Sequence, residues 1–316
     1  MVRHIPVLAE EIFEHLVLEN SNDFENYYHL DCNFGDGGHV EYFIDNLIKL
    51  ERYKNIFIYA LDLDEDAIAR GKDFLKKYTD NKKVSIHIIQ GNFANITDLI
   101  IDIKFNSVLF DLGLSTYQLN GAGRGFSFKF DEKLDMRFST LPATEGELTA
   151  YDIVNFWSIE NICLILRQYA DEKSAWRIAN KIAEVRENKK IETSGELADI
   201  IEHQVFKGKK GKIHPATKTF QAIRIAVNAE LQVLDKGLQG ALDVLTDGGR
   251  IAVISYHSLE DIIVKHYFKK LETEGQGRRL NKKIIIPSDT EIKSNPKSRS
   301  AKLRIFKKEK NEKDTK

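Results

Sequence analysis

Short apolar runs alternate with helical periodicity in the first third of the chain. The runs occupy 27–32 (YYHLDC), 56–62 (IFIYALD), 84–89 (VSIHII) and 107–113 (SVLFDLG). Continuous runs of this length are typical of parallel strands that are covered on both faces. Between the first two runs, one apolar stripe with helical spacing contains Val40, Phe43, Ile44, Leu47 and Ile48. The pattern therefore predicts a βαβ unit that opens a parallel sheet.

The periodicity becomes helical after about residue 117. Helices are predicted over 159–170, 174–185 and 194–205, the last with Ser194 as its potential N-cap. Strand patterns return at 250–256, 282–287 and 301–306. We predict one discontinuous α/β domain, formed by 1–118 and 214–316, that encloses an all-helical insertion over 119–213.

Composition narrows the class of protein. With 316 residues and 42% hydrophobic content, the chain can form one full α/β core and an insertion. It has only two cysteines, no signal-peptide pattern and no run of about 20 apolar residues, so we expect a reduced, cytoplasmic protein without a membrane span. The nine histidines and two cysteines show no metal-site spacing, so no metal is expected.

The charge is unevenly distributed along the chain. Residues 262–316 carry 17 Lys and Arg against 7 Asp and Glu, whereas the whole chain has a net charge of −1. This basic segment is either a solvated tail or a contact surface for a phosphate backbone, and charge alone does not separate the two.

Polar residues gather where the predicted strands end. Asp31 ends the first strand and begins the segment DCNFGDGGH, which leads directly into a helix, as at the ligand site of an open α/β sheet. Val40 stands where a dinucleotide fold needs its third glycine, which argues against a nicotinamide cofactor. Asp62 suits two ribose hydroxyls, and Phe93 is placed to pack on an adenine. Together with Asp111, these residues favour a site for S-adenosylmethionine (SAM). The alternative is that Phe93 only fills the core and that the aspartates only cap helices.

Aromatic residues interleaved with basic ones suggest a nucleic-acid surface, although an ordered structural loop is the alternative. Phe126, Phe128, Tyr256 and His257 are candidates for stacking on a base that leaves its helix. Arg124, Arg137, Lys218, Arg224 and Arg299 are candidates for phosphate contacts. Thr217, Gln221 and Arg224 share one face of a predicted helix.

Six motifs of the chain resemble those of a known family: FGxGGH, DLGxS, RGFSF, LDMR, HPATxTFQAxRIxVN and ISxHSLED. In this order they are similar to the ribosomal RNA small subunit methyltransferase H family, also called MraW. The resemblance implies a Rossmann-like SAM-dependent methyltransferase sheet with an inserted all-helical domain for substrate recognition. It implies methylation of the exocyclic N4 of a cytidine in the decoding region of 16S rRNA, with the small ribosomal subunit as partner. The SAM contacts that it implies are Gly37, Gly38, His39, Asp62, Phe93, Asp111 and Gln118.

The chain departs from the family pattern at Cys32, Asn33, Asp36 and Tyr117. The added carboxylate of Asp36 puts in question what this position does for the cofactor. The reaction that the resemblance implies is not affected by these differences.

Methylation of an exocyclic amine needs an acceptor for its hydrogens, because the lone pair of that nitrogen is delocalised into the ring. We predict Asp111 and nearby backbone carbonyls as candidates for this acceptor, although the chain lacks the D/N/S-P-P-Y/F/W string of many amino-methylating DNA enzymes. Two alternatives stay open, a nicotinamide oxidoreductase and a ribosome-assembly factor that binds RNA without turnover. The sequence does not decide between a monomer and a homodimer.

Overall fold

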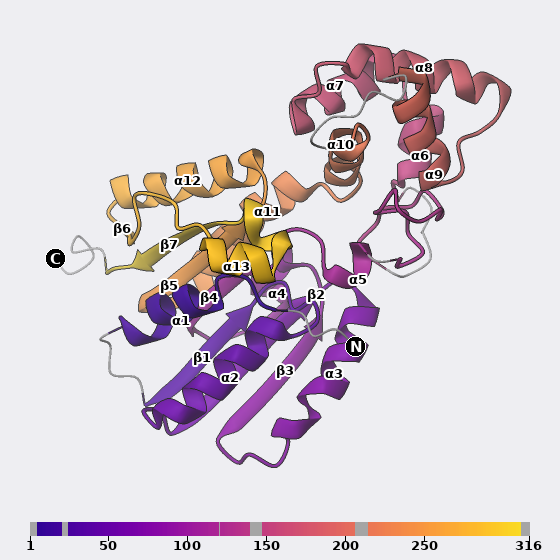
Figure 1. Ribbon diagram of the computed structural model, residues 1–316. Coiled ribbons are helices and arrows are strands. Elements are labelled where there is room, and N and C mark those ends of the chain that lie inside the picture. Colours follow the sequence, from indigo (N-terminus) through magenta and orange to yellow (C-terminus); the bar gives the residue numbers. More distant parts are fainter. Residues whose placement is uncertain (1–4, 21–24, 120, 140–146, 206–213, 311–316) are drawn as a thin grey trace. The chain divides into compact units, whose positions relative to one another are not determined.

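The chain divides into two compact units in the computed structural model, which describes residues 5–20, 25–119, 121–139, 147–205 and 214–310 (Figure 1). The sheet unit consists of Met1–Gly113 and Leu231–Lys316, and the helical unit is Leu114–Glu230. Across the described residues, no helix is long and apolar enough to cross a membrane.

A seven-stranded sheet with the order β3-β2-β1-β4-β5-β7-β6 forms the centre of the sheet unit. The strands are β1 (Asn26–Asp31), β2 (Asn55–Asp62), β3 (Val84–Gln90), β4 (Phe105–Asp111), β5 (Leu245–Ser255), β6 (Gly277–Arg279) and β7 (Lys302–Lys308). Strands β1 to β5 pair in parallel, whereas β7 is antiparallel to both β5 and β6. The predicted Rossmann-like sheet is confirmed, with its last three strands supplied by chain that follows the helical unit.

Helices cover both faces of this sheet (Figure 1). They are α1 (Ala9–Phe13), α2 (Gly38–Leu50), α3 (Glu65–Leu75), α4 (Ile96–Leu99), α11 (Glu230–Val244), α12 (Ser258–Thr273) and α13 (Asp289–Ser294), with shorter π or 3₁₀ turns at Glu14–Leu18, Lys76–Tyr78, Phe93–Asn95 and Pro296–Ser300. The apolar stripe of α2 packs in one core with Tyr27 and Ile58, and the stripe of α11 packs in a second core with Leu30 and Leu61. Alternate residues of one strand therefore serve opposite cores, as the uninterrupted apolar runs predict.

One predicted strand does not form. Within 282–287, only Ile285 makes a bridge, to Leu303 of β7, and Ile286 is exposed. Gly277–Arg279 pairs with the later residues of β7, from Phe306 to Lys308, and Ile285 meets β7 only at Leu303. An apolar run predicts strand propensity, but it does not reveal how many of its residues will pair with the neighbouring strand.

The helical unit contains α5 (Thr116–Leu119), α6 (Ala150–Phe156), α7 (Ile159–Ala170), α8 (Ala175–Asn188), α9 (Ser194–Asp199), a π turn at Ile200–Val205 and α10 (Thr217–Val227). These helices share a core of their own. The N-cap of α9 is Thr193 and not Ser194 as predicted. Thr193 Oγ1 accepts from the Glu196 amide, whereas the Ser194 hydroxyl donates to the carbonyl of Phe130. The unit extends to Glu230, so α10 lies with the helices.

A bidentate ion pair fixes α12 to β7. Arg304 Nε and Nη2 donate to the two carboxylate oxygens of Asp261 over 2.6 and 3.1 Å, and the two side chains are only 9% and 14% exposed. Because both charges are largely withdrawn from water, each depends on the other for its solvation.

Replacing Asp261 by Ala should destabilise the sheet unit by about 3 kcal/mol, because it leaves a guanidinium largely buried without its carboxylate. Denaturant titration followed by circular dichroism measures the change. The matched control is Glu25→Ala, which removes the solvent-exposed partner of Lys54 and should leave the midpoint nearly unchanged. Equal effects of the two substitutions would contradict a structural role for the Arg304 pair.

Candidate active site

The loop that follows β1 is tied to the end of β2. The Gly35 amide donates to Asp62 Oδ2 over 2.7 Å, and the Asp64 amide donates to Asp62 Oδ1 over 2.9 Å. Gly37 is the N-cap of α2 with a φ of 76°, a left-handed conformation that glycine adopts without strain. Gly38 then begins the helix. The predicted cofactor loop is thus a tight turn at the carboxyl edge of the sheet, where an open α/β sheet binds its ligand.

Asp36, which departs from the family pattern, is paired with a basic residue of α3. Its Oδ1 accepts from Arg70 Nε of α3 over 3.1 Å. The added carboxylate is therefore neutralised by a residue of this chain.

Asp31 is buried, and only one of its two carboxylate oxygens accepts a hydrogen bond from a described residue. Its Oδ1 accepts from the Asn33 amide over 2.9 Å, but its Oδ2 has no hydrogen-bond partner among the described residues. Burial raises the pKa of Asp31 to about 6, partly opposed by the nearby His39. Burial also raises the pKa of Asp62 to about 6. Two carboxylates whose charged form is disfavoured by burial, both at one edge of the sheet, are typical of a site that receives hydrogen-bond donors or positive charge from a ligand.

Phe93 lies at the same edge, just after β3. Asn92 Oδ1 accepts from the Ala94 amide over 2.9 Å and so fixes the turn that carries Phe93. The Phe93 ring meets Phe110 edge-to-face at 5.4 Å and lies against Gly237 of α11, where a Cβ would approach it to 2.5 Å. The ring is partly buried, so packing against the core and contact with an adenine are both compatible with its position.

Asp111, the last residue of β4, is contacted from two sides. Tyr256, which follows β5, donates its hydroxyl to Asp111 Oδ1 over 2.8 Å. On the other side, His39 Nδ1 lies 3.4 Å from Asp111 Oδ2. His39 Nε2 lies 2.9 Å from the carbonyl of Val7, and because a carbonyl only accepts, this nitrogen carries a proton. His39 is buried and connects the start of the chain to the end of β4.

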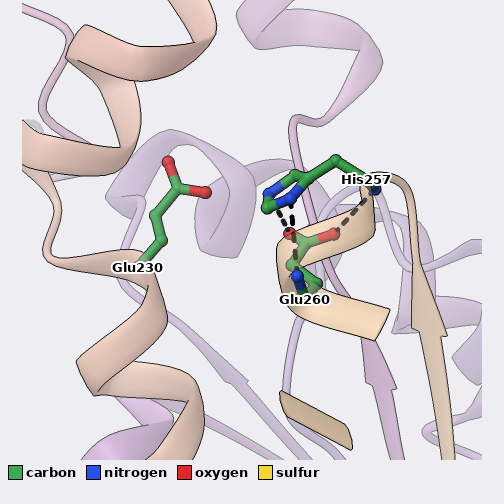
Figure 2. A group of neighbouring side chains, drawn as sticks. All are labelled: Glu230, His257 and Glu260. Atoms are coloured by element: carbon green, nitrogen blue, oxygen red, sulfur yellow. Dashed lines mark hydrogen bonds and ion pairs between the residues drawn. The ribbon is translucent and has the colours of Figure 1, made fainter. Parts of the chain in front are cut away.

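His257 and Glu260 form a reciprocal cap at the start of α12, and Figure 2 shows their side chains against each other. The Glu260 amide donates to His257 Nδ1 over 3.4 Å, and the amides of Tyr256 and His257 both donate to Glu260 Oε2. The cap fixes the backbone of the two residues that we predicted to stack on a base. Tyr256 faces Asp111, a contact that sequence reasoning missed and that only the pairing of β4 with β5 brings about.

In the helical unit, several predicted RNA contacts have partners within the unit. Arg124 is buried, donates to the carbonyl of Phe138 over 2.6 Å and lies over the ring of Phe126. Phe126 is buried and stacks on Phe138 at 5.7 Å. Phe128 stacks on His214 at 4.2 Å. The RGFSF segment is therefore an ordered structural loop, whatever else it contacts.

The remaining predicted positions differ in how strongly they are engaged. Arg137 pairs with Asp135 and Glu147, and Arg224 forms a bidentate pair with Glu230 at 2.7 and 2.9 Å. Lys218 donates to the carbonyl of Asp171, and Gln221 to that of Tyr169. Gln118, on α5, is buried and accepts from the Ser115 amide over 3.0 Å. Arg299, in the sheet unit, is exposed.

The edge formed by β1, β2 and β4 fits SAM. Its observed features are Asp31 Oδ2, which has no partner in the described part of the chain, the Asp62 carboxylate at the ribose position of such sheets, and a glycine turn close to both. An ammonium or hydroxyl donor would find acceptors here, and a sulfonium would find negative charge. A phosphate would instead meet the carboxylates of Asp31, Asp62 and Asp111, which disfavours a dinucleotide.

The strand order, the antiparallel β7 and this carboxylate edge define a Rossmann-like, SAM-dependent methyltransferase. The chain belongs to the MraW methylase family, whose model matches residues 1–309. It is 43% identical over 310 residues to the ribosomal RNA small subunit methyltransferase H of Coprothermobacter proteolyticus, covering 97% of this chain and 96% of that one. It is also 43% identical to the protein of that name from a Sulfurihydrogenibium species, covering 96% and 99%. The predicted family, enzyme class and cofactor are thereby confirmed.

The solved structures that match this chain do so at low sequence identity. An rRNA methylase from Streptococcus thermophilus is 11% identical with a TM-score of 0.44, covering 98% of this chain and 99% of that one. The N-methyltransferase NodS from Bradyrhizobium japonicum, solved with S-adenosyl-L-homocysteine, is 7% identical with a TM-score of 0.39, covering 96% and 86%. At these scores the likeness adds nothing to what the strand order shows.

Replacing Asp31 by Asn should stabilise the protein without cofactor at pH 8. The pKa of Asp31 is about 6 in the folded protein and 3.8 in the unfolded chain. Ionisation of this carboxyl therefore makes the folded protein less stable as the pH rises from about 4 to about 6. The full cost, up to about 3 kcal/mol at 1.4 kcal/mol per pKa unit, is present at pH 8. Thermal unfolding of both proteins should differ at pH 8 and converge near pH 4. A variant that unfolds below the wild type at pH 8 would contradict the destabilising burial of this carboxylate.

Proposed function

We propose that this chain transfers the methyl group of SAM to the exocyclic N4 of a cytidine in the decoding region of 16S rRNA. The proposal is supported by membership of the MraW methylase family and by relatives named ribosomal RNA small subunit methyltransferase H. The observation that carries it is Asp111, a carboxylate held by Tyr256 and His39 at the edge where the sheet presents its other carboxylates. We further propose that the reaction takes place in the cytoplasm, on the small ribosomal subunit and without a metal.

The cofactor contacts divide into those at the sheet edge and one in the helical unit. At the edge, Asp62 accepts from the ribose hydroxyls, Asp31 accepts from the ammonium group, and the glycine turn of Gly37 and Gly38 allows close approach. Phe93 packs beside the adenine and His39 lies near the methionine portion. Gln118 remains a proposed contact from α5, as the resemblance implies. SAM supplies a methyl group on a sulfonium, which leaves as a neutral thioether.

Asp111 has a defined task in this reaction. The amine nitrogen gains a methyl and must lose a proton, and its lone pair becomes available only when an acceptor draws its hydrogens out of the ring plane. Asp111 accepts one of these hydrogen bonds, and the proton passes to its carboxylate or to solvent afterwards. The side chains on Asp111 hold the carboxylate in one orientation, which limits the positions from which the amine can approach.

We propose that the helical unit recognises the RNA, the role predicted for the 119–213 insertion. Lys218, which donates to the carbonyl of Asp171, is a proposed phosphate contact in this unit, and the exposed Arg299 is one in the sheet unit. Arg124, Arg137 and Arg224 act first by fixing their own loops and helix, through the partners described above, and Phe126 does so as part of the core. Phe128 and His257 remain candidates for stacking on a base that leaves its helix, a step that costs a few kcal/mol. The oligomeric state stays open between monomer and homodimer.

Labelled SAM and small ribosomal subunits from cells lacking this protein test the proposal directly. Nucleoside analysis of the recovered RNA should show label in N4-methylated cytidine. Label in another nucleoside would overturn the assignment of the atom. SAM binding and RNA retention without any label would instead favour an assembly factor.

Asp111→Asn should lower kcat in this assay at least 100-fold, because the amide keeps the shape of the side chain but is a much weaker proton acceptor. The matched control is Asp80→Asn, which makes the same change at an exposed position in the turn before β3 and should leave kcat unchanged. Wild-type turnover by the Asp111 variant would remove this residue from the mechanism.

A further inference from the structure

Tyr256 makes two contacts with the segment that ends β4. Its hydroxyl donates to Asp111 Oδ1, and its ring lies over Gly113, where a Cβ would approach the ring to 3.2 Å. Gly113 has a φ of 100°, so a side chain at this position would be strained as well as crowded. The tyrosine thus holds both the carboxylate and the turn that follows it.

The hydroxyl is committed to this contact. Burial raises the pKa of Tyr256 well above its usual value, and the Asp111 carboxylate raises it further. The phenol therefore stays a donor at every pH at which the enzyme works, and a carboxylate oxygen is a strong acceptor for it. The backbone of Tyr256 is fixed as well, because its amide donates to Glu260 Oε2 over 2.8 Å.

This geometry separates two roles that one aromatic residue can have beside a methylation site. A ring that stacks on the target base contributes its face, and phenylalanine serves equally well. A hydroxyl that orients a carboxylate contributes a hydrogen bond, which phenylalanine lacks. The observed contact is of the second kind.

We infer that Tyr256 is a positioning residue for methyl transfer, which acts by holding the Asp111 carboxylate through its hydroxyl and the following turn through its ring. The inference rests on the proposed function of Asp111 as the acceptor for the amine hydrogens. Tyr256 restricts the rotation of this carboxylate, so that the lone pair left on Oδ1 keeps one direction. The residue assists the transition state through Asp111 and does not itself need to touch the RNA.

The test is Tyr256→Phe in the labelled-methyl assay with small subunits. The expected result is a fall in kcat of about tenfold, the size of one hydrogen bond to a charged group, with the KM values for SAM and RNA within twofold of wild type. The matched control is Tyr27→Phe. This change removes another buried hydroxyl from the same sheet. Tyr27 donates that hydroxyl to Ser107, which lies on β4 four residues before Asp111, so kcat should not change.

Three other outcomes overturn the inference. An unchanged kcat shows that the hydroxyl does not position Asp111, and a raised KM for RNA shows that Tyr256 contacts the substrate instead. An equal loss in the Tyr27 variant shows a general structural effect. A wild-type enzyme that transfers no label refutes the proposed function and not this contact. The contact is then tested by thermal unfolding, where Tyr256→Phe should cost less in an Asp111→Ala background than in the wild type.

Discussion

The burial of carboxylates at the carboxyl edge of a parallel sheet is the constraint on which the site depends. Strands β1, β2 and β4 each end in an aspartate, and their parallel pairing brings these ends to one edge. Burial raises the pKa of Asp31 and of Asp62 to about 6, so the protein without cofactor is less stable near neutral pH than it would be with neutral residues there. A cationic ligand with hydroxyl donors relieves that cost, which is why the edge favours SAM over a phosphate-bearing cofactor.

The strands that form this edge could be predicted from the sequence, but not all of the contacts between them. The apolar runs predicted every strand of the parallel part of the sheet, because burial on both faces leaves an uninterrupted signal. The strand predicted at 282–287 does not form, because strand propensity does not show how much of a run will pair with β7. The cap of α9 was misplaced by one residue because Thr193 and Ser194 are both good capping residues. The position of Asp31 at the end of a strand could be predicted from the sequence. The contact between Tyr256 and Asp111 could not, because it depends on the register of β4 against β5.

For the predicted RNA contacts, the sequence identified residue types that suit RNA binding, but not the partners that these residues have in the fold. Arginines beside aromatic residues suggested phosphate and base contacts, yet Arg124, Arg137 and Arg224 all have partners within the helical unit. A guanidinium pairs readily with a carboxylate or carbonyl of its own chain, and a linear sequence does not show which partner lies nearby. Their first effect is to give the RGFSF loop and α10 a fixed shape, and recognition of RNA by that shape remains proposed.

A crystal structure with bound SAM tests the central claim most directly. The account predicts the ribose hydroxyls at Asp62, the ammonium group at Asp31 and the methyl group directed toward the side of Asp111 that Tyr256 and His39 leave accessible. A cofactor bound at another edge of the sheet, or one with its methyl group turned away from Asp111, would contradict it.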